Sequence, residues 1–271
     1  MLRRRTMSTG KRETVQVVEE LKSSGKWTVP AGCKSVDVFI VGGGGSGASS
    51  GPERGGGGGG SGCTELYLGI SVTPGESINY VIGNGGNSVR STSSYNDAKD
   101  GLKGQNSWFR DSAIYYANGG NGGQYSGKGG DGGSGGGSGR PAEKTAGYIG
   151  GSDGSNGAGD MPGIGQGTTT RCPFNNKLYA GGGGGGGEYS SGSSQGGGGI
   201  GIGGGSLGNP TNGKPNTGSG GGSFYISGSN VSGGISSGSG GSGIIVLRYN
   251  KYKCESAVGF LIQKLKINKC K

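Results

Sequence analysis

Uninterrupted runs of glycine constrain this chain more than any other feature. The longest spans residues 181–187, and shorter blocks occupy residues 42–45 and 55–60. Glycine loses more backbone entropy on folding than any other residue, so ordering 75 glycines among 271 residues needs an unusual compensation. Collagen offers one, but it requires glycine at every third position and abundant proline. This chain has 8 prolines, and its glycines come in blocks.

The remaining solution is an extended left-handed helix of the polyproline II type, with about 3 residues per turn and a rise of about 3.1 Å per residue. Such a helix has no internal hydrogen bonds, so its amides must bond to water or to neighbouring segments. Because glycine has no Cβ, helices of this kind can approach closely and bond laterally. The glycine blocks therefore predict a layer of packed polyglycine II helices that is held by hydrogen bonds rather than by buried hydrocarbon.

Strand-like segments bracket the glycine blocks. Residues 36–41 alternate with the period of a strand and run directly into the first glycine block. Residues 64–72 and 77–82 predict a hairpin, because the Pro74-Gly75 pair between them suits a type II turn. Further strands are expected at residues 27–29, 107–110, 113–117 and 243–249. The fold class predicted by these patterns is all-β, a β-sandwich combined with packed polyglycine II helices.

The composition changes at both ends of the chain. Residues 1–25 are expected to be an N-terminal arm or attachment segment, in which residues 14–21 form either one strand or two helical turns. Residues 26–250 are expected to form one glycine-rich domain, and residues 251–271 a basic tail that is either a surface helix or disordered. No secretory signal peptide is expected, since the basic start is not followed by an apolar run, and no segment is long enough to span a membrane.

Charge and cysteine content narrow the function classes. The net charge of +10 comes partly from the two ends of the chain, and no compact nucleic-acid motif accompanies it, so no nucleic-acid partner is expected. The 5 cysteines are odd in number and scattered, which argues against a disulfide framework. Cys33 and Cys63 lie close to the ends of the first two glycine blocks and are either neighbours or separate small buried residues.

The residue inventory also argues against catalysis. The chain has no histidine, which excludes Ser-His-Asp triads, Cys-His dyads and histidine-ligated zinc. Residues 208–215 come close to a phosphate-binding loop, but Pro215 stands where a hydroxyl must meet magnesium. Asp131, Asp153 and Asp160 do not recur at the nine-residue period of calcium-binding repeats. We therefore predict no catalytic residues, no metal site and no cofactor.

Charged and aromatic patches separate the glycine runs. If these runs are rigid rods, the patches gather at the rod ends, as binding loops do on other rigid scaffolds. Aromatic faces beside cations suit sugars or anionic surface polymers, whereas the alternative is that the patches are simple solvated turns. The candidate receptor-binding residues are Tyr95, Lys99, Arg140, Lys144, Tyr148, Arg171, Phe174, Lys177, Tyr189 and Lys214.

Several motifs resemble those of a known family. They are W-T-V-P-A-G at residues 27–32, V-D-V-F-I-V-G-G-G-G-S-G at residues 36–47, a looser match at residues 68–86, and G-G-S-G-I-I-V-L-R-Y at residues 240–249. This succession resembles the glycine-rich domain of bacteriophage tail and fibre proteins and of some gut-bacterial proteins. It is more distantly similar to the glycine-rich domain of the anaplastic lymphoma kinase receptor family, which implies a TNF-like or jelly-roll-like sandwich with packed polyglycine helices.

The resemblance implies a non-enzymatic virion protein, made in the host bacterial cytoplasm, that acts as a tail-fibre or fibre-tip adhesin and displays host-recognition loops. The implied partners are other virion proteins, a host cell-surface protein or glycan, and a second copy of the chain as an open alternative, without membrane insertion. Two other functions stay open: a structural capsid, tail or fibre component without a receptor role, and a bacterial surface or secreted ligand-like glycine-rich protein. The resemblance transfers no loop residue, because such adhesins vary most at their loops.

Overall fold

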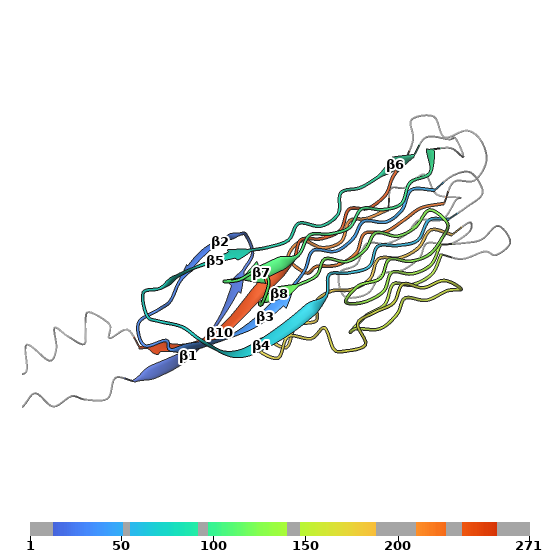
Figure 1. The fold of residues 1–271 in the computed structure, drawn as a ribbon. Helices are drawn as coiled ribbons and strands as arrows, with labels where there is room; N and C mark the ends of the chain where they lie inside the picture. The colour runs from blue at the N-terminus through green and yellow to red at the C-terminus, as the bar shows by residue number, and fades with distance from the viewer. Residues whose placement is uncertain are drawn as a thin grey trace, which may run out of the picture.

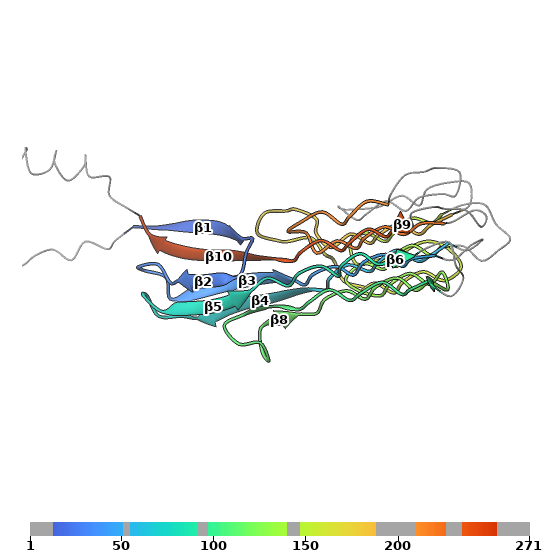
Figure 2. The same ribbon diagram turned by 90° about the horizontal axis from the view of Figure 1, so that it is seen from above.

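The computed structural model describes residues 13–50, 55–91, 97–139, 147–187, 210–225 and 235–253. The molecule is long and narrow, with β-strands at one end and extended glycine-rich segments lying side by side at the other (Figures 1 and 2). We call these two parts the sheet end and the glycine layer. Most of the regular structure is antiparallel β-sheet, so the expected all-β fold is confirmed.

Within the described residues, the sheet end contains two four-stranded antiparallel sheets. The order in the first sheet is β1 (Thr14–Leu21), β10 (Ile244–Tyr252), β3 (Ser35–Val41) and β4 (Thr64–Ser71). The order in the second sheet is β2 (Gly25–Thr28), β5 (Ser77–Val81), β7 (Ser107–Phe109) and β8 (Tyr116–Ala117). A further pair, β6 (Arg90–Ser91) and β9 (Ile235–Ser236), lies at the opposite end of the molecule (Figure 1).

The main hydrophobic core gathers side chains from both sheets. Val38 and Leu247 of the first sheet are buried in one cluster with Phe109 of the second. The ring of Trp27 belongs to the same cluster, with its centroid 6.0 Å from that of Phe109 and 5.2 Å from that of Tyr249. Burying a large apolar side chain stabilises a fold by about 1.5–3 kcal/mol. The strands therefore supply the hydrophobic burial that glycine cannot.

The outer face of the first sheet is covered near the glycine layer. Phe39 and Val246 are buried there in a second cluster with Cys172 and Tyr179. The last two residues belong to a segment, residues 168–180, that we call the strap. Because the core covers one face of β3 and the strap covers the other, this strand is apolar on both faces.

Residues 42–50 form the central segment of the glycine layer. Their amides donate to three neighbouring segments in turn, and the same neighbour recurs at every third residue. Gly42 and Gly45, for example, donate to the carbonyls of Cys63 (3.0 Å) and Gly60 (2.8 Å). The three acceptor segments are residues 57–63, 99–105 and 238–241. A lateral partner at every third residue is the period of polyproline II, which agrees with the packed polyglycine II helices expected from the sequence.

Carbonyl groups of the central segment accept hydrogen bonds from other neighbours. The amides of Gly86 and Gly221 donate to the carbonyls of Gly44 (2.8 Å) and Gly45 (2.9 Å). A Cβ on Gly45 would overlap the main-chain carbonyl of Asn121. Glycine is therefore needed here because the neighbouring backbones approach too closely for any side chain.

The strand registers continue into the glycine layer. Val41 of β3 pairs with Thr64 of β4, and the next residue, Gly42, donates to Cys63 in the same register. The register of β3 with β10 extends into residues 238–241 in the same way. The strands and the polyglycine helices are thus continuous stretches of chain with no turn between them.

The hairpin expected between residues 64–72 and 77–82 is wrong. β4 pairs with β3 in the first sheet, whereas β5 pairs with β2 and β7 in the second. The turn itself forms, since the Glu76 amide donates to the Thr73 carbonyl at 2.9 Å and Gly75 has a φ of 87°. The two strands enter different sheets because each buries its apolar residues against the shared core from its own side.

The two ends of the chain also differ from the sequence-based expectation. Residues 14–21, for which the sequence leaves a strand and two helical turns open, form a strand that pairs along its full length with β10 in the first sheet. The closing strand extends to Tyr252, beyond the expected end at residue 249. Residues 1–12 and 254–271 lie outside the described residues. The TNF-like or jelly-roll-like topology that the resemblance implies stays a prediction.

Candidate functional site

One end of the glycine layer adjoins the sheets, and the other end lies away from them (Figures 1 and 2). We call the second of these the far end. The β6–β9 pair lies there, and an isolated bridge joins Gly55 to Tyr225. Several described segments therefore have their last described residues at this end, as the Gly55–Tyr225 bridge and the Arg90–Ser236 pair show.

Lys99 is the candidate residue that the structure places most clearly at the far end. Its amide donates to the Ser49 hydroxyl at 2.7 Å, and the Ser49 amide donates back to the Lys99 carbonyl at 2.9 Å. Its ammonium group lies 3.6 Å from the Asp97 carboxylate and remains more than half exposed. The main chain of Lys99 is therefore held firmly, while its charge faces solvent.

Tyr125 is an exposed aromatic residue on the same side, and the sequence analysis did not select it. Its amide donates to the Asp100 carboxylate at 2.9 Å, and its side chain is 45% exposed. It stands in a turn closed by a 2.8 Å bond from the Gln124 amide to the Lys128 carbonyl. The sequence could have pointed to Tyr125, because an aromatic residue between two glycine runs has few apolar neighbours to pack against and is therefore expected at the surface.

Tyr148 packs on the glycine layer. Its carbonyl accepts from the Gly185 amide at 3.0 Å, and its half-buried ring lies against Gly159, whose φ is 110°. Lys214 lies beside Gly241 of the glycine layer, and its carbonyl accepts from the Thr217 hydroxyl at 2.6 Å. The other four candidates, Tyr95, Arg140, Lys144 and Tyr189, lie outside the described residues.

Arg171, Phe174 and Lys177 belong to the strap and lie against the sheet end. The ammonium of Lys177 lies 2.6 Å from the Glu20 carboxylate of β1. The ring of Phe174 is stacked under the guanidinium of Arg248, with 4.5 Å between the guanidinium carbon and the ring centroid. These contacts fasten the strap to the first sheet, and they separate this group from Lys99 and Tyr125 at the far end.

The pKa shifts of these groups agree with the contacts between the strap and the first sheet. The hydrogen bond from Lys177 lowers the pKa of Glu20, and the same contact raises the pKa of Lys177. Burial raises the pKa of the Tyr179 phenol, which accepts a 2.9 Å hydrogen bond from the side-chain amide of Asn175. Arg171 donates to the carbonyl of Asn176 at 2.9 Å, within the strap itself. The guanidinium of Arg171 is therefore hydrogen-bonded within the strap, whereas Phe174 and Lys177 contact the first sheet.

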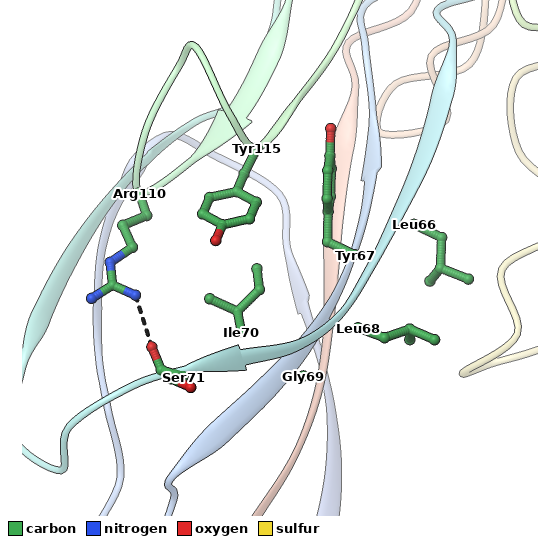
Figure 3. Close-up of a pocket in the computed structure, with 8 residues that line it drawn as sticks. All are labelled: Leu66, Tyr67, Leu68, Gly69, Ile70, Ser71, Arg110 and Tyr115. Carbon is green, nitrogen blue, oxygen red and sulfur yellow. Dashed lines mark hydrogen bonds between the residues drawn. The ribbon is translucent and has the colours of Figure 1, made fainter.

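A hollow of about 510 Å³ lies between β4 of the first sheet and the residues Arg110 and Tyr115 beside the second sheet (Figure 3). Tyr67 and Tyr115 stand on one side of it, with a ring-centroid separation of 5.3 Å. Arg110 closes one end by donating to the Ser71 carbonyl at 2.8 Å. A second groove of about 410 Å³ runs between β4 and the strap; it is lined by Phe39, Thr64, Glu65, Leu66, Gln166, Thr168, Thr169, Arg171 and Pro173.

The described residues contain no group of three or more acidic, cysteine or histidine side chains placed to hold a metal ion. Cys33, Cys63 and Cys172 are free, and burial raises the pKa of each thiol. Cys33 lies in the core of the sheet end, whereas Cys63 lies at the end of a glycine segment. In the part of the chain that the structure describes, no helix has the length and apolar character needed to cross a membrane.

Comparison with known proteins identifies the domain type. A family model described as a glycine-rich domain matches residues 20–250, which covers most of the chain. No match was found among curated proteins. The match includes both the strands and the glycine segments that the structure joins.

Proposed function

This chain belongs to the glycine-rich domain family, and we propose that it is a non-enzymatic virion protein, a tail-fibre or fibre-tip adhesin that displays host-recognition loops on a polyglycine scaffold. Its partners are other virion proteins at one end and a host cell-surface protein or glycan at the other. It acts by binding, and the receptor groups are those that aromatic and cationic side chains recognise.

The polarity of the molecule carries this proposal. The described chain begins and ends side by side at the sheet end, where the Lys253 amide donates to the Glu13 carbonyl at 2.9 Å. The glycine layer runs from the sheet end to the β6–β9 pair at the opposite end of the molecule (Figure 1). A molecule built in this way can be mounted through one end while it presents variable segments at the other.

The glycine layer suits this role because lateral main-chain hydrogen bonds, and not contacts between side chains, join its segments. Its segments are bonded to one another through main-chain groups at about every residue, as in the pairs Gly58 to Gly137 (2.9 Å) and Gly59 to Gly221 (2.8 Å). Connections at the far end can change in length and sequence while these bonds remain. Rigid scaffolds that carry variable loops are a common arrangement for binding proteins.

Competition for host cells tests the proposal. Purified protein is added to bacteria before the phage, and the fraction of phage left unbound is counted. The wild-type protein is expected to block adsorption, and the far-end double variant Lys99→Glu, Tyr125→Ala to block it at least severalfold less. The matched control, Lys26→Glu with Ile114→Ala, changes exposed residues of the sheet end and is expected to block as well as wild type.

A structural fibre or tail component without a receptor role is the second candidate, and the open sheet edges described below favour it. Labelled protein that binds virions but no host cell would support this second function. Equal loss of blocking by the far-end variant and by its control would also argue against recognition at the far end.

A further inference from the structure

Within the described residues the first sheet has two open edges, β1 and β4, and we propose that they pair with each other in neighbouring copies of this chain. β1 of one copy adds to β4 of the next, so the sheet continues from copy to copy with every far end pointing the same way. The partner is therefore a second copy of this chain. The inference concerns assembly and does not rest on receptor recognition.

The edge of β4 is capped at its two ends by side chains. At the end near the glycine layer, the Thr64 amide donates to the side-chain carbonyl of Gln166 at 2.9 Å. At the other end, the Ser71 carbonyl accepts from Arg110 at 2.8 Å. These two bonds satisfy main-chain groups that face away from β3. They leave the middle of the strand uncovered.

Leu66 and Leu68 form this uncovered middle (Figure 3). Main-chain groups of successive residues in an antiparallel strand face alternate sides, so both leucines face away from β3, as Thr64 does. The register shift of β4 between Tyr67 and Ile70 then brings Ser71 to the same side. No residue in the described ranges bonds to their main chain from outside the sheet. Their side chains are 44% and 63% exposed. An edge with free main-chain groups and exposed apolar side chains is a template for another strand.

The edge of β1 has the matching arrangement. The Lys253 amide donates to the Glu13 carbonyl, so the odd-numbered residues of this strand bond to β10. Gln16 and Val18 therefore face outward with their main-chain groups, and the described residues provide no partner for them there. The Val18 side chain is 42% exposed and lies on the same face of the sheet as those of Leu66 and Leu68.

Strand direction and register fit the two edges together. β1 runs toward the glycine layer and β4 runs away from it, so they are antiparallel when two copies have the same orientation. Placing Val18 opposite Leu66 of the next copy also places Gln16 opposite Leu68. The outward main-chain groups then face one another, and the apolar side chains meet on one face of the sheet.

The charged side chains near the two edges are already paired within one copy, Glu13 with Lys253 at 3.0 Å and Arg110 with Glu76 at 2.8 Å. The proposed register therefore rests on strand direction, on the outward main-chain groups and on the apolar side chains. Pairing of two different edges is heterologous, so it produces a closed ring or an open fibre according to the rotation between copies.

Sedimentation velocity of the full chain over a range of protein concentrations tests the pairing. Val18→Pro and Leu66→Pro each remove an outward N–H from one edge, which costs no bond within the sheet. Wild type is expected to form species larger than the monomer as concentration rises, and each variant alone to remain monomeric. A 1:1 mixture is expected to form dimers of one copy each, because each variant retains the edge that the other lacks.

Other outcomes would overturn the proposal: wild type that stays monomeric, a mixture that stays monomeric, or Val18→Pro that still self-associates through β4 alone. If a proline variant fails to fold, Val18→Lys and Leu66→Lys replace it, since both side chains are exposed. Leu102→Lys is the matched control on the glycine layer and must leave assembly unchanged.

Discussion

Replacing Gly45 by alanine tests whether lateral main-chain bonding holds the glycine layer together. Gly45 lies in the central segment, where its amide donates to the Gly60 carbonyl at 2.8 Å and its carbonyl accepts from Gly221 at 2.9 Å. A Cβ at this position would overlap the carbonyl oxygen and carbon of Asn121. Because this obstacle is main chain and not the end of a flexible side chain, the neighbouring segment must move.

The expected cost follows from the bonds that this neighbour makes. The Asn121 carbonyl accepts from Gly60 at 2.9 Å, and the amides of Gly120 and Gly123 donate to the central segment at 2.9 and 3.0 Å. A main-chain hydrogen bond contributes about 1 kcal/mol net, and an unsatisfied buried group costs about 1–3 kcal/mol. Weakening these bonds is expected to lower the free energy of unfolding by about 3–5 kcal/mol, against a typical total of about 5–15 kcal/mol.

Urea unfolding followed by the fluorescence of Trp27 and Trp108 measures this loss. The matched control is Gly25→Ala in β2, where the new Cβ lies 3.1 Å from the hydroxyl of Tyr80, a side-chain end that can shift. The control is expected to cost less than about 1 kcal/mol. If Gly45→Ala costs no more than Gly25→Ala, close main-chain packing does not hold the layer and the reasoning fails.

Three further predictions concern the sheet end and the strap. The hydrogen bond from Lys177 lowers the pKa of Glu20, so the stabilisation from this carboxylate is present above its unfolded pKa and is lost as pH falls through its folded pKa. In calorimetry between pH 6 and pH 3, the difference in melting temperature between wild type and Glu20→Gln should therefore shrink. A difference that stays constant would contradict this. Arg248→Lys removes the planar group stacked on Phe174 and should cost about 1 kcal/mol in urea unfolding, whereas an unchanged midpoint would show that the stack contributes nothing. Val38→Asn buries an unpaired amide in the core and should lower the free energy of unfolding by about 2–4 kcal/mol. Residues 181–187 should then become sensitive to protease. Continued protection of these residues would mean that the glycine layer is independent of the core.

Local patterns in the sequence identified much of the fold. The strand period at residues 36–41 and the glycine blocks led to the strands and the lateral bonding without knowledge of which segments are neighbours. Pairing was harder to predict, because it depends on contacts between distant segments. The expected hairpin failed for this reason: its turn formed as the Pro74-Gly75 pair predicts, but the core drew its two strands into different sheets.

The candidate binding residues show the same limit. The sequence placed Lys99 and Lys177 in one class, as cations between glycine runs. Lys177 in fact meets Glu20, 157 residues earlier in the chain, while Lys99 lies at the far end. The residues next to each lysine do not distinguish these two environments. Each glycine segment has one end at the sheets and one at the far end, and composition does not show which end a given lysine is near. The apolar residues around Lys177, such as Cys172 and Tyr179, were the available signal that this segment covers a sheet.

The continuity of register explains how a layer made mostly of one residue type reaches a single arrangement. Polyglycine segments are nearly identical, so sliding one past another by three residues would recreate most of the same hydrogen bonds. The strands remove this ambiguity, because a shift of Val41 relative to Thr64 would misplace buried side chains in the core. Serine hydroxyls also help to specify the register inside the layer, as where Ser223 donates to the Ala48 carbonyl at 2.7 Å. The sheet end therefore fixes the register of the glycine layer.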